Sequence, residues 1–185
     1  EPYHSFINHL KYQLRGYLGE KGFFDDLNPP ILVLGVPNSG TTIFTNALAQ
    51  HPLIYNEGES VAVWDPLHNY PGSGDFKTDY DASQWYKRRL RGNFAYYQWL
   101  TDADIVINKQ PKNTLRIHFI KEIFPDSKII HIIRDPRAVV CSNLRSRRHI
   151  KPQERIGKPF SGYLKPRRWR EWIDSDPVEQ QAYLW

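Results

Sequence analysis

Three short, mainly apolar runs stand out in the pattern of hydrophobic and polar positions along this chain. The runs cover residues 31–35, 105–108 and 128–133. Segments with helical spacing precede and separate them, at residues 4–19, 41–50, 82–100 and 114–124. Uninterrupted apolar strands that alternate with helices are typical of a parallel sheet covered on both faces. We therefore predict an α/β fold, a three-layer parallel sheet with helices on both faces.

The loop after the first run is built from small residues. Gly35 and Gly40 bracket it, and Thr41 and Thr42 open the next helical segment. Such a loop lets successive backbone N–H groups and the positive end of a helix face a bound anion. Its spacing matches the P-loop pattern G-x-x-x-x-G-K-[ST], except that Thr41 stands in place of the lysine. This predicts a P-loop NTPase-like fold and leaves a kinase or ATPase as a less favoured alternative, because those enzymes use the lysine on the β- and γ-phosphates.

The third run leads into a second strand, turn and helix, with Arg134 at the turn. Asp135 can cap this helix, and Pro136 suits its first turn because its missing N–H has no partner to lose there. Ser142 follows Arg134 by eight residues, about two helical turns, and can reach the same anion if the helix starts late or bends. The second run leads into Asn108-Lys109-Gln110-Pro111. All three segments leave the carboxyl ends of predicted strands, where ligands of such sheets bind.

Together these segments, across residues 30–146, resemble the PAPS-dependent sulfotransferases, which use 3′-phosphoadenosine 5′-phosphosulfate as donor. The resemblance implies transfer of a sulfuryl group to a hydroxyl or amine, with Lys109 acting on the transferred group. It implies that Arg134 and Ser142 hold the 3′-phosphate. It further implies a set of loop residues for the 5′-phosphosulfate, namely Pro37, Asn38, Ser39, Gly40, Thr41 and Thr42. The chain departs from the family at Asn38, where a basic residue is usual, and Lys112 is a candidate for the missing cation.

The catalytic base is expected between the first helical segment after the loop and residues 65–81, which read as irregular. The similar tyrosylprotein sulfotransferases carry a catalytic glutamate in a G-E element at this place. That favours Glu59, which follows a glycine, with Glu57 as the alternative. His51 and His68 stay open as bases, because histidine has this role in several cytosolic sulfotransferases. The seven histidines show no metal-binding spacing, and sulfuryl transfer needs no metal, so we predict no metal site.

The positive charge of the chain is local. Its net charge is +5, and residues 134–170 hold twelve Lys or Arg against two acids. Such a patch suits a polyanionic small molecule, and it also suits nucleic acid. A nucleic-acid-binding module is nevertheless less favoured, because the aromatic residues that can stack on bases lie mostly at 85–99. We predict a small-molecule, carbohydrate or peptide hydroxyl as acceptor and no nucleic-acid partner.

The length of 185 residues suits a single domain, residues 1–185. Residues 178–185 show a helical pattern with neither a cap nor a following strand, which predicts a domain truncated at its C-terminus. No apolar run reaches the roughly 18 residues that span a bilayer, and the N-terminus lacks a signal-peptide plan. We therefore expect a cytoplasmic enzyme without a membrane segment, or one of the Golgi lumen if the chain is a fragment.

Overall fold

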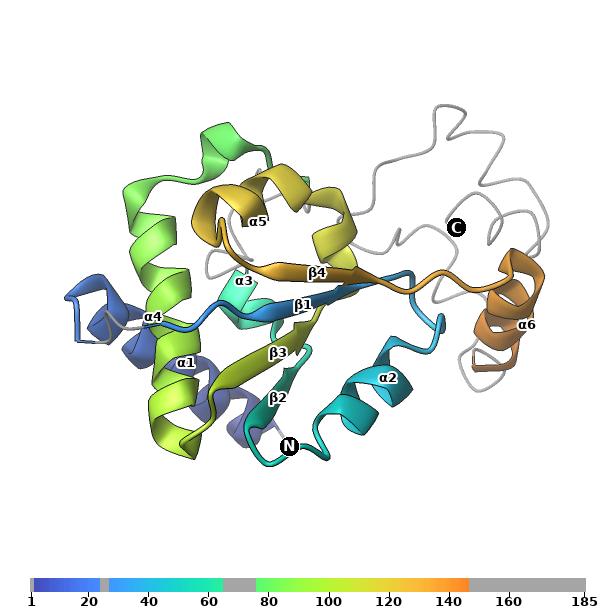
Figure 1. The fold of residues 1–185 in the computed structure, drawn as a ribbon, viewed down its shortest axis with the longest axis horizontal. Helices are drawn as coiled ribbons and strands as arrows, with labels where there is room; N and C mark the ends of the chain where they lie inside the picture. Colours follow the sequence, from blue (N-terminus) through green and yellow to red (C-terminus); the bar gives the residue numbers. More distant parts are fainter. Residues whose placement is uncertain (1, 24–26, 65–75, 147–185) are drawn as a thin grey trace.

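The computed structural model describes residues 2–23, 27–64 and 76–146, which build one four-stranded sheet and its covering helices (Figure 1). All strand pairs are parallel, and the order across the sheet is β2-β3-β1-β4. The strands are β1 (Ile31–Leu34), β2 (Ile54–Gly58), β3 (Ile105–Lys109) and β4 (Lys128–His131). The central strands β1 and β3 are largely buried, and both are apolar except for Asn108 and Lys109 at the end of β3.

Helices cover both faces of this sheet. The helices of the described residues are α1 (Pro2–Glu20), α2 (Thr41–Leu48), α3 (Val61–Trp64), α4 (Gln84–Thr101), α5 (Ile117–Ile123) and α6 (Pro136–Ser146), with 3₁₀ turns η1 (Asp79–Asp81) and η2 (Pro111–Leu115). The chain crosses the sheet in one direction from β1 to β2 and in the other from β2 through β3 to β4. Right-handed crossovers then place α2 on one face and α3, α4 and α5 on the opposite face. The contacts agree, because among the described elements α2 touches strands alone, whereas α4 touches α1, α3 and α5. The predicted three-layer α/β fold is confirmed.

The main core lies between the sheet and the layer of α3, α4 and α5. Trp64 is fully buried there, with its ring centroid 5.9 Å from that of Phe94 and 6.3 Å from that of Phe124. Val106 of β3 belongs to the same cluster. Side chains alternate along a strand, so Asn108, two residues after Val106, points to this face as well, and Lys109 points to the face of α2.

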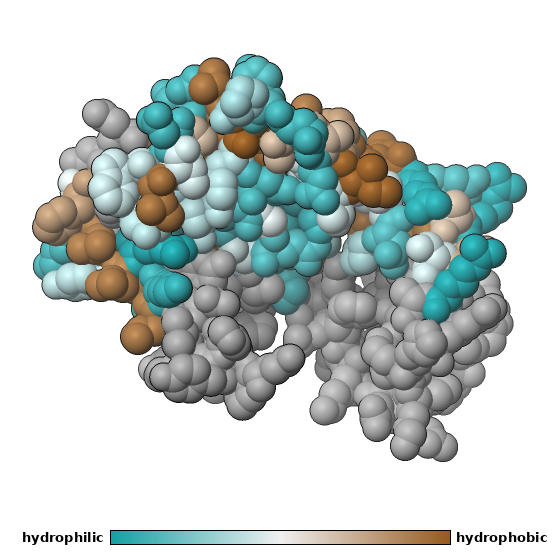
Figure 2. Space-filling view, turned by 90° about the horizontal axis from the view of Figure 1, so that it is seen from below, coloured by the Kyte–Doolittle hydropathy of each residue, from teal (hydrophilic) through white to brown (hydrophobic). Residues whose placement is uncertain are grey.

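Helix α1 lies against α4 at a contact between two glycines. A Cβ atom on Gly92 would lie 2.1 Å from the Cα of Gly19, so the two backbones touch. Leu10, Leu14 and Tyr17 of α1 are exposed instead, and Figure 2 shows hydrophobic side chains at the end of the molecule where α1 and α4 lie. The apolar spacing therefore predicted the helix, whereas the packed face is set by the glycines.

Several boundaries differ from the sequence-based prediction. Strand β2 was not predicted because polar residues interrupt it, and α3 was not predicted because four residues are too few to show helical spacing. The predicted strand 128–133 ends at His131, and Ile133 is exposed beyond it. The helix predicted at 114–124 begins as the 3₁₀ turn η2 and becomes α-helical only at Ile117. Residues 65–75 of the predicted loop, most of the basic stretch and the C-terminal pattern at 178–185 lie outside the described residues.

Candidate functional site

The predicted motifs meet at one edge of the sheet, because all four parallel strands end there. Strand β1 leads into the small-residue loop, β2 into Glu59, β3 into Gln110 and β4 toward Arg134. The carboxyl ends of the strands in an open parallel sheet form the usual ligand-binding edge. Lys109 pairs in register with Val33, two residues before the loop begins at Gly35.

The small-residue loop has the backbone of an anion cradle. Asn38 and Gly40 have left-handed φ angles of 64° and 101°, and asparagine is one of the few non-glycine residues that adopt this conformation readily. A Cβ atom on Gly35 would lie 2.7 Å from Ser39 Oγ and 2.9 Å from the carbonyl oxygen of Ile132, so this position needs glycine. The start of the loop therefore packs closely against the chain that follows β4, and a larger residue would not fit there.

Helix α2 begins directly after this loop and has no side-chain cap at Gly40. Its first N–H groups consequently face the loop mouth, where the helix dipole favours an anion. Ser39 Oγ is buried and has no hydrogen-bond partner within the described part of the chain. These donors fit the phosphate end of a nucleotide. The space beside Gly40 is open, because a Cβ atom built there would have no neighbour within 4 Å.

Arg134 connects the second anion motif to the first. Its Nη1 donates a hydrogen bond of 2.8 Å to the carbonyl oxygen of Asn38. No carboxylate of the described residues pairs with this guanidinium, although its neighbour Asp135 binds Arg137. The side-chain and backbone hydrogen bonds from Arg137 lower the pKa of Asp135 to about 2. Asp135 Oδ1 also accepts from the backbone N–H of Arg137 at 2.9 Å, which confirms the predicted cap.

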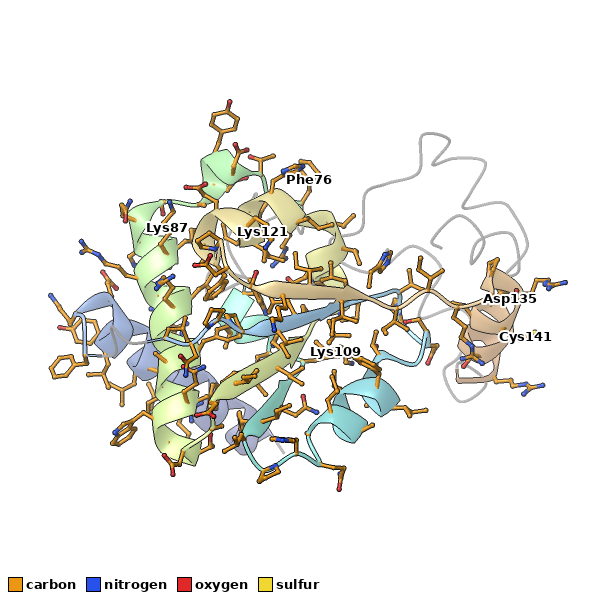
Figure 3. All side chains as sticks on the ribbon, in the orientation of Figure 1. Phe76, Lys87, Lys109, Lys121, Asp135 and Cys141 are labelled. Carbon is orange, nitrogen blue, oxygen red and sulfur yellow. The ribbon has the colours of Figure 1, made fainter. Side chains whose placement is uncertain are left out.

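Ser142 lies half-buried on α6 and forms no hydrogen bond with Arg134 among the described residues. Helix α6 makes no contact with another described helix or strand, and Figure 3 shows Cys141 on it and Asp135 just before it, both away from Lys109. The shared phosphate contact of Arg134 and Ser142 therefore stays a prediction.

Lys109 and Glu59 are joined by an ion pair between Lys109 Nζ and Glu59 Oε1. The side chain of Lys109 is 8% exposed and that of Glu59 is 49% exposed, so the pair has one buried end and one open end. Burial lowers the pKa of the Lys109 ammonium below its ordinary value. Because Lys109 points to the face of α2, the paired Glu59 carboxylate lies on that face too.

Glu57 points elsewhere. Its Oε2 accepts a hydrogen bond from Asn108 Nδ2, on the face of α3. Desolvation by burial raises the pKa of Glu57 to about 7, although hydrogen bonds with Ser60 and Asn108 and the charge of Arg15 act in the opposite direction. The two candidate glutamates are thus separated by the sheet. The contact of Asn108 with Glu57 was not predicted, because the motif Asn108-Lys109-Gln110-Pro111 implies a role for Lys109 alone.

The other candidate residues are less well placed or lie outside the description. His51 precedes β2 and is therefore near the amino end of that strand, at the opposite edge of the sheet from the motif loops. Lys112 is half-buried in η2, directly after β3 and at the edge with the motif loops. His68 falls outside the described residues.

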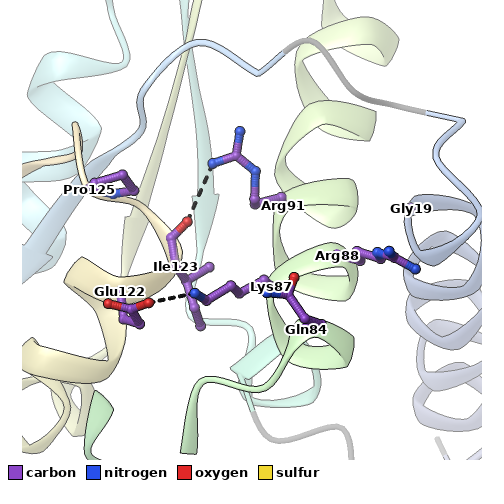
Figure 4. A pocket seen from close by; sticks show the side chains of 8 residues that line it. All are labelled: Gly19, Gln84, Lys87, Arg88, Arg91, Glu122, Ile123 and Pro125. Atoms are coloured by element: carbon purple, nitrogen blue, oxygen red, sulfur yellow. Dashed lines mark hydrogen bonds and ion pairs between the residues drawn. The ribbon is translucent and has the colours of Figure 1, made fainter. Parts of the chain in front are cut away.

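A cavity of about 360 Å³ lies between α1, α4 and the end of α5 (Figure 4). Its lining is Gly19, Gln84, Lys87, Arg88, Arg91, Glu122, Ile123 and Pro125. Lys87 Nζ and Glu122 Oε1 are 2.5 Å apart, and Arg91 reaches the carbonyl of Ile123 at 3.4 Å. None of the predicted site residues contributes to it. Across residues 2–23, 27–64 and 76–146 there is no cluster of three potential metal ligands and no helix suited to crossing a membrane.

Parts of this chain are similar in sequence to known proteins. The chain is 31% identical over 120 residues to a protein of Caenorhabditis briggsae named "Putative protein-tyrosine sulfotransferase" and 28% identical over 138 residues to nodulation protein NoeE of Sinorhizobium fredii. These alignments cover 60% and 63% of this chain but only 41% and 32% of those relatives. An uncharacterised Aquifex aeolicus protein is 29% identical over 126 residues, which are 62% of this chain and 16% of that protein. The chain thus spans less than half the length of these relatives.

The family match covers more of the chain than any of these pairs. Residues 29–164 match the sulfotransferase family. This range contains the small-residue loop, Glu59, Lys109, Arg134 and Ser142. The match extends over most of the chain and includes every predicted site residue, so this chain belongs to the sulfotransferase family.

Proposed function

We propose that this protein transfers a sulfuryl group from PAPS to a hydroxyl, or to an amine, of an acceptor. The proposal rests on the ion pair of Lys109 and Glu59, which lies at the edge of the sheet where the small-residue loop begins. Lys109 supplies a cation that can stabilise a leaving phosphate, and Glu59 supplies a carboxylate that can accept the proton of an acceptor hydroxyl. Both groups lie on the face of α2, the helix that follows the loop.

Donor binding is assigned to the two anion motifs. The backbone N–H groups of residues 39–42 and the Ser39 hydroxyl would hold the 5′-phosphosulfate, and Arg134 would hold the 3′-phosphate with Ser142. The hydrogen bond from Arg134 to the Asn38 carbonyl supports this assignment, because it brings the guanidinium to the loop. PAPS supplies an activated sulfuryl group and a stable phosphate leaving group.

Glu59 would act as the general base. It would take the proton of the acceptor hydroxyl while the acceptor oxygen forms a bond to sulfur and the bond from sulfur to the phosphate oxygen breaks. Lys109 would donate a hydrogen bond to that phosphate oxygen as its negative charge grows. In the described state Lys109 is paired with Glu59. A phosphate that attracts Lys109 would release Glu59 from its counter-ion and make this carboxylate a stronger base.

The acceptor is proposed by class alone, as a carbohydrate, peptide or small-molecule hydroxyl. The name of the Caenorhabditis briggsae relative adds peptide tyrosine to the acceptors worth testing. Transfer of labelled sulfate from PAPS to a panel of sugars, phenols and tyrosine peptides tests the proposal. We expect product with at least one class of acceptor.

A binding experiment separates this function from that of a kinase. We expect calorimetry to show binding of the donor product, 3′-phosphoadenosine 5′-phosphate, and weaker binding of ATP with Mg²⁺. The reason is that Thr41 stands in place of the lysine that NTPases use. Tighter binding of ATP, with no transfer of sulfate to any acceptor, would overturn the proposal.

A further inference from the structure

Strand β2 contains an irregularity at Glu57. Asn56 is in register with Ile107, and Gly58 is in register with Asn108, so Glu57 is an extra residue that has no partner on β3. Gly58 follows with a left-handed φ of 77°. In a regular strand Glu57 and Glu59 would point to the same face, because they are two residues apart. A bulge breaks this alternation and can redirect a side chain next to an active site.

The contacts of the two carboxylates show that the alternation is broken here. Glu57 binds Asn108, and Glu59 binds Lys109. Asn108 and Lys109 are successive residues of β3, so their side chains lie on opposite faces of the sheet. The side chains of Glu57 and Glu59 therefore lie on opposite faces as well. Of the two, Glu59 is on the face covered by α2.

Asn108 is the residue that holds this arrangement. Its side chain is fully buried and takes part in three hydrogen bonds. Nδ2 donates to Glu57 Oε2 and, at 3.0 Å, to the carbonyl oxygen of Gly58, while Oδ1 accepts from Trp64 Nε1 at 2.9 Å. Trp64 is itself fixed in the aromatic core. The amide of Asn108 is thus anchored by α3 on one side and holds both residues of the bulge on the other.

We propose that Asn108 and Glu57 are positioning residues, which hold the bulge of β2 so that the next carboxylate, Glu59, faces Lys109 and the donor site. Glu57 acts through its hydrogen bond and does not exchange a proton with the acceptor. The role of Glu59 in this inference rests on the proposed sulfuryl transfer. The orientation of the two glutamates does not, because it follows from the contacts alone.

The environment of Glu57 explains why a hydrogen-bond acceptor is needed there and a charge is not. Oε1 is buried without a hydrogen-bond partner among the described residues, a setting that disfavours the ionised carboxylate. Glutamine at this position would keep an oxygen for Asn108 Nδ2 without the charge. Alanine would remove the acceptor and leave the Asn108 amide only its contacts with Gly58 and Trp64.

The proposal is tested with Glu57→Gln, Glu57→Ala and Asn108→Ala. We expect Glu57→Gln to keep kcat within about threefold of the original protein, because the hydrogen bond is retained. Glu57→Ala and Asn108→Ala should lower kcat by about 10²-fold at an unchanged dissociation constant for the donor product, as expected for a misplaced catalytic group. Asn93→Ala is the matched control, since Asn93 is an equally buried asparagine of α4 that binds Arg89. Asn93→Ala should lower the free energy of unfolding and leave kcat unchanged.

Two results would overturn the proposal. A loss of activity in Glu57→Gln as large as that in Glu59→Gln would mean that Glu57 itself exchanges the proton. Full activity in Asn108→Ala, in protein shown by urea unfolding to be folded, would mean that the bulge needs no such support.

A readout that needs no turnover separates this inference from the proposed function. The pH dependence of Lys109 acetylation by acetic anhydride, followed by mass spectrometry, reports on its pairing with Glu59. We expect Asn108→Ala and Glu59→Gln to change this profile in the same way, with Lys121 unchanged as the internal control. If the profiles agree but no acceptor is ever sulfated, the proposed function fails and the positioning role stands. An unchanged profile in Asn108→Ala would refute the positioning role even in an active sulfotransferase.

Discussion

Lys109 and Glu59 form an ion pair across 50 residues of sequence, between the last residue of β3 and the residue after β2. The pair exists because β2 and β3 are neighbouring parallel strands that end at the same edge of the sheet. The bulge at Glu57 then directs Glu59 to the side of Lys109. These two charges are therefore brought together by strand pairing, and the small-residue loop after β1 begins at the same edge of the sheet.

Arg134 should contribute to nucleotide affinity through the 3′-phosphate. Arg134→Ala is expected to weaken binding of 3′-phosphoadenosine 5′-phosphate by about 1.5 to 3 kcal/mol, the scale of a hydrogen bond to a charged group. The effect should vanish for a ligand without the 3′-phosphate, measured by calorimetry. Arg137→Ala, which removes an exposed arginine paired with Asp135, serves as the control. Equal losses for both ligands would mean that Arg134 acts only by holding the Asn38 carbonyl.

Asn38→Arg should have opposite effects on affinity and on stability. The added guanidinium should tighten donor binding by about 1.5 to 3 kcal/mol, and the gain should shrink as salt rises. The left-handed φ of 64° makes arginine less favourable than asparagine here, so the free energy of unfolding should fall by about 1 kcal/mol. If the loop keeps its shape, this backbone cost is the same in the free and the donor-bound protein, so it does not change the affinity for the donor. Unchanged or weaker binding in folded Asn38→Arg would show that another residue already supplies the cation.

Glu57 should make stability depend on pH. Its pKa is raised from 4.5 to about 7 in the folded protein, so the folded state holds the proton more tightly than the unfolded state. The stabilisation is fully present below pH 4.5 and is lost as pH rises to about 7, by at most about 3 kcal/mol. Urea unfolding at several pH values should show this decline, and Glu57→Gln should remove it. The same slope in Glu57→Gln would assign the decline to other groups.

The contact between α1 and α4 should tolerate no side chain at Gly92. Alanine there would place Cβ 2.1 Å from the Cα of Gly19, so the helices must separate. Separation should destabilise the protein by about 1 to 3 kcal/mol, as overpacking usually does. Arg88→Ala, an exposed position on the same helix, should change stability by less than about 0.5 kcal/mol. Equal thermal midpoints for Gly92→Ala and the original protein would contradict the contact.

The sequence was informative where a short, mainly apolar run forms a strand. The apolar runs at β1, β3 and β4 predicted three parallel strands, and the glycines of the loop predicted the turn before α2. Strand β2 was missed because its polar residues are satisfied by distant partners. Asn56 binds Asn46 of α2, and Glu57 binds Asn108 of β3. Such hydrogen bonds depend on tertiary structure and leave no periodic pattern in the sequence.

The sequence indicated which residues gather at the candidate site, but it did not indicate the directions in which the two glutamates point. The motifs indicated Lys109, Arg134 and a glutamate near position 58, but the alternation rule alone places Glu57 and Glu59 on one face. Only the bulge in β2 separates them. Asn38 was interpreted as a lost charge, whereas the structure adds a conformational reason for asparagine, its left-handed backbone.

A single-turnover assay shows whether Glu59 is the base of the proposed sulfuryl transfer. Labelled sulfate from PAPS is followed to an acceptor identified by the screen, in the original protein, in Glu59→Gln and in the control Glu122→Gln. Glu122 is an exposed glutamate that pairs with Lys87 on the helical layer. We predict a loss of about 10²- to 10⁴-fold in Glu59→Gln, with donor-product affinity and the control unchanged. Transfer at the original rate by Glu59→Gln would mean that Glu59 is not the base.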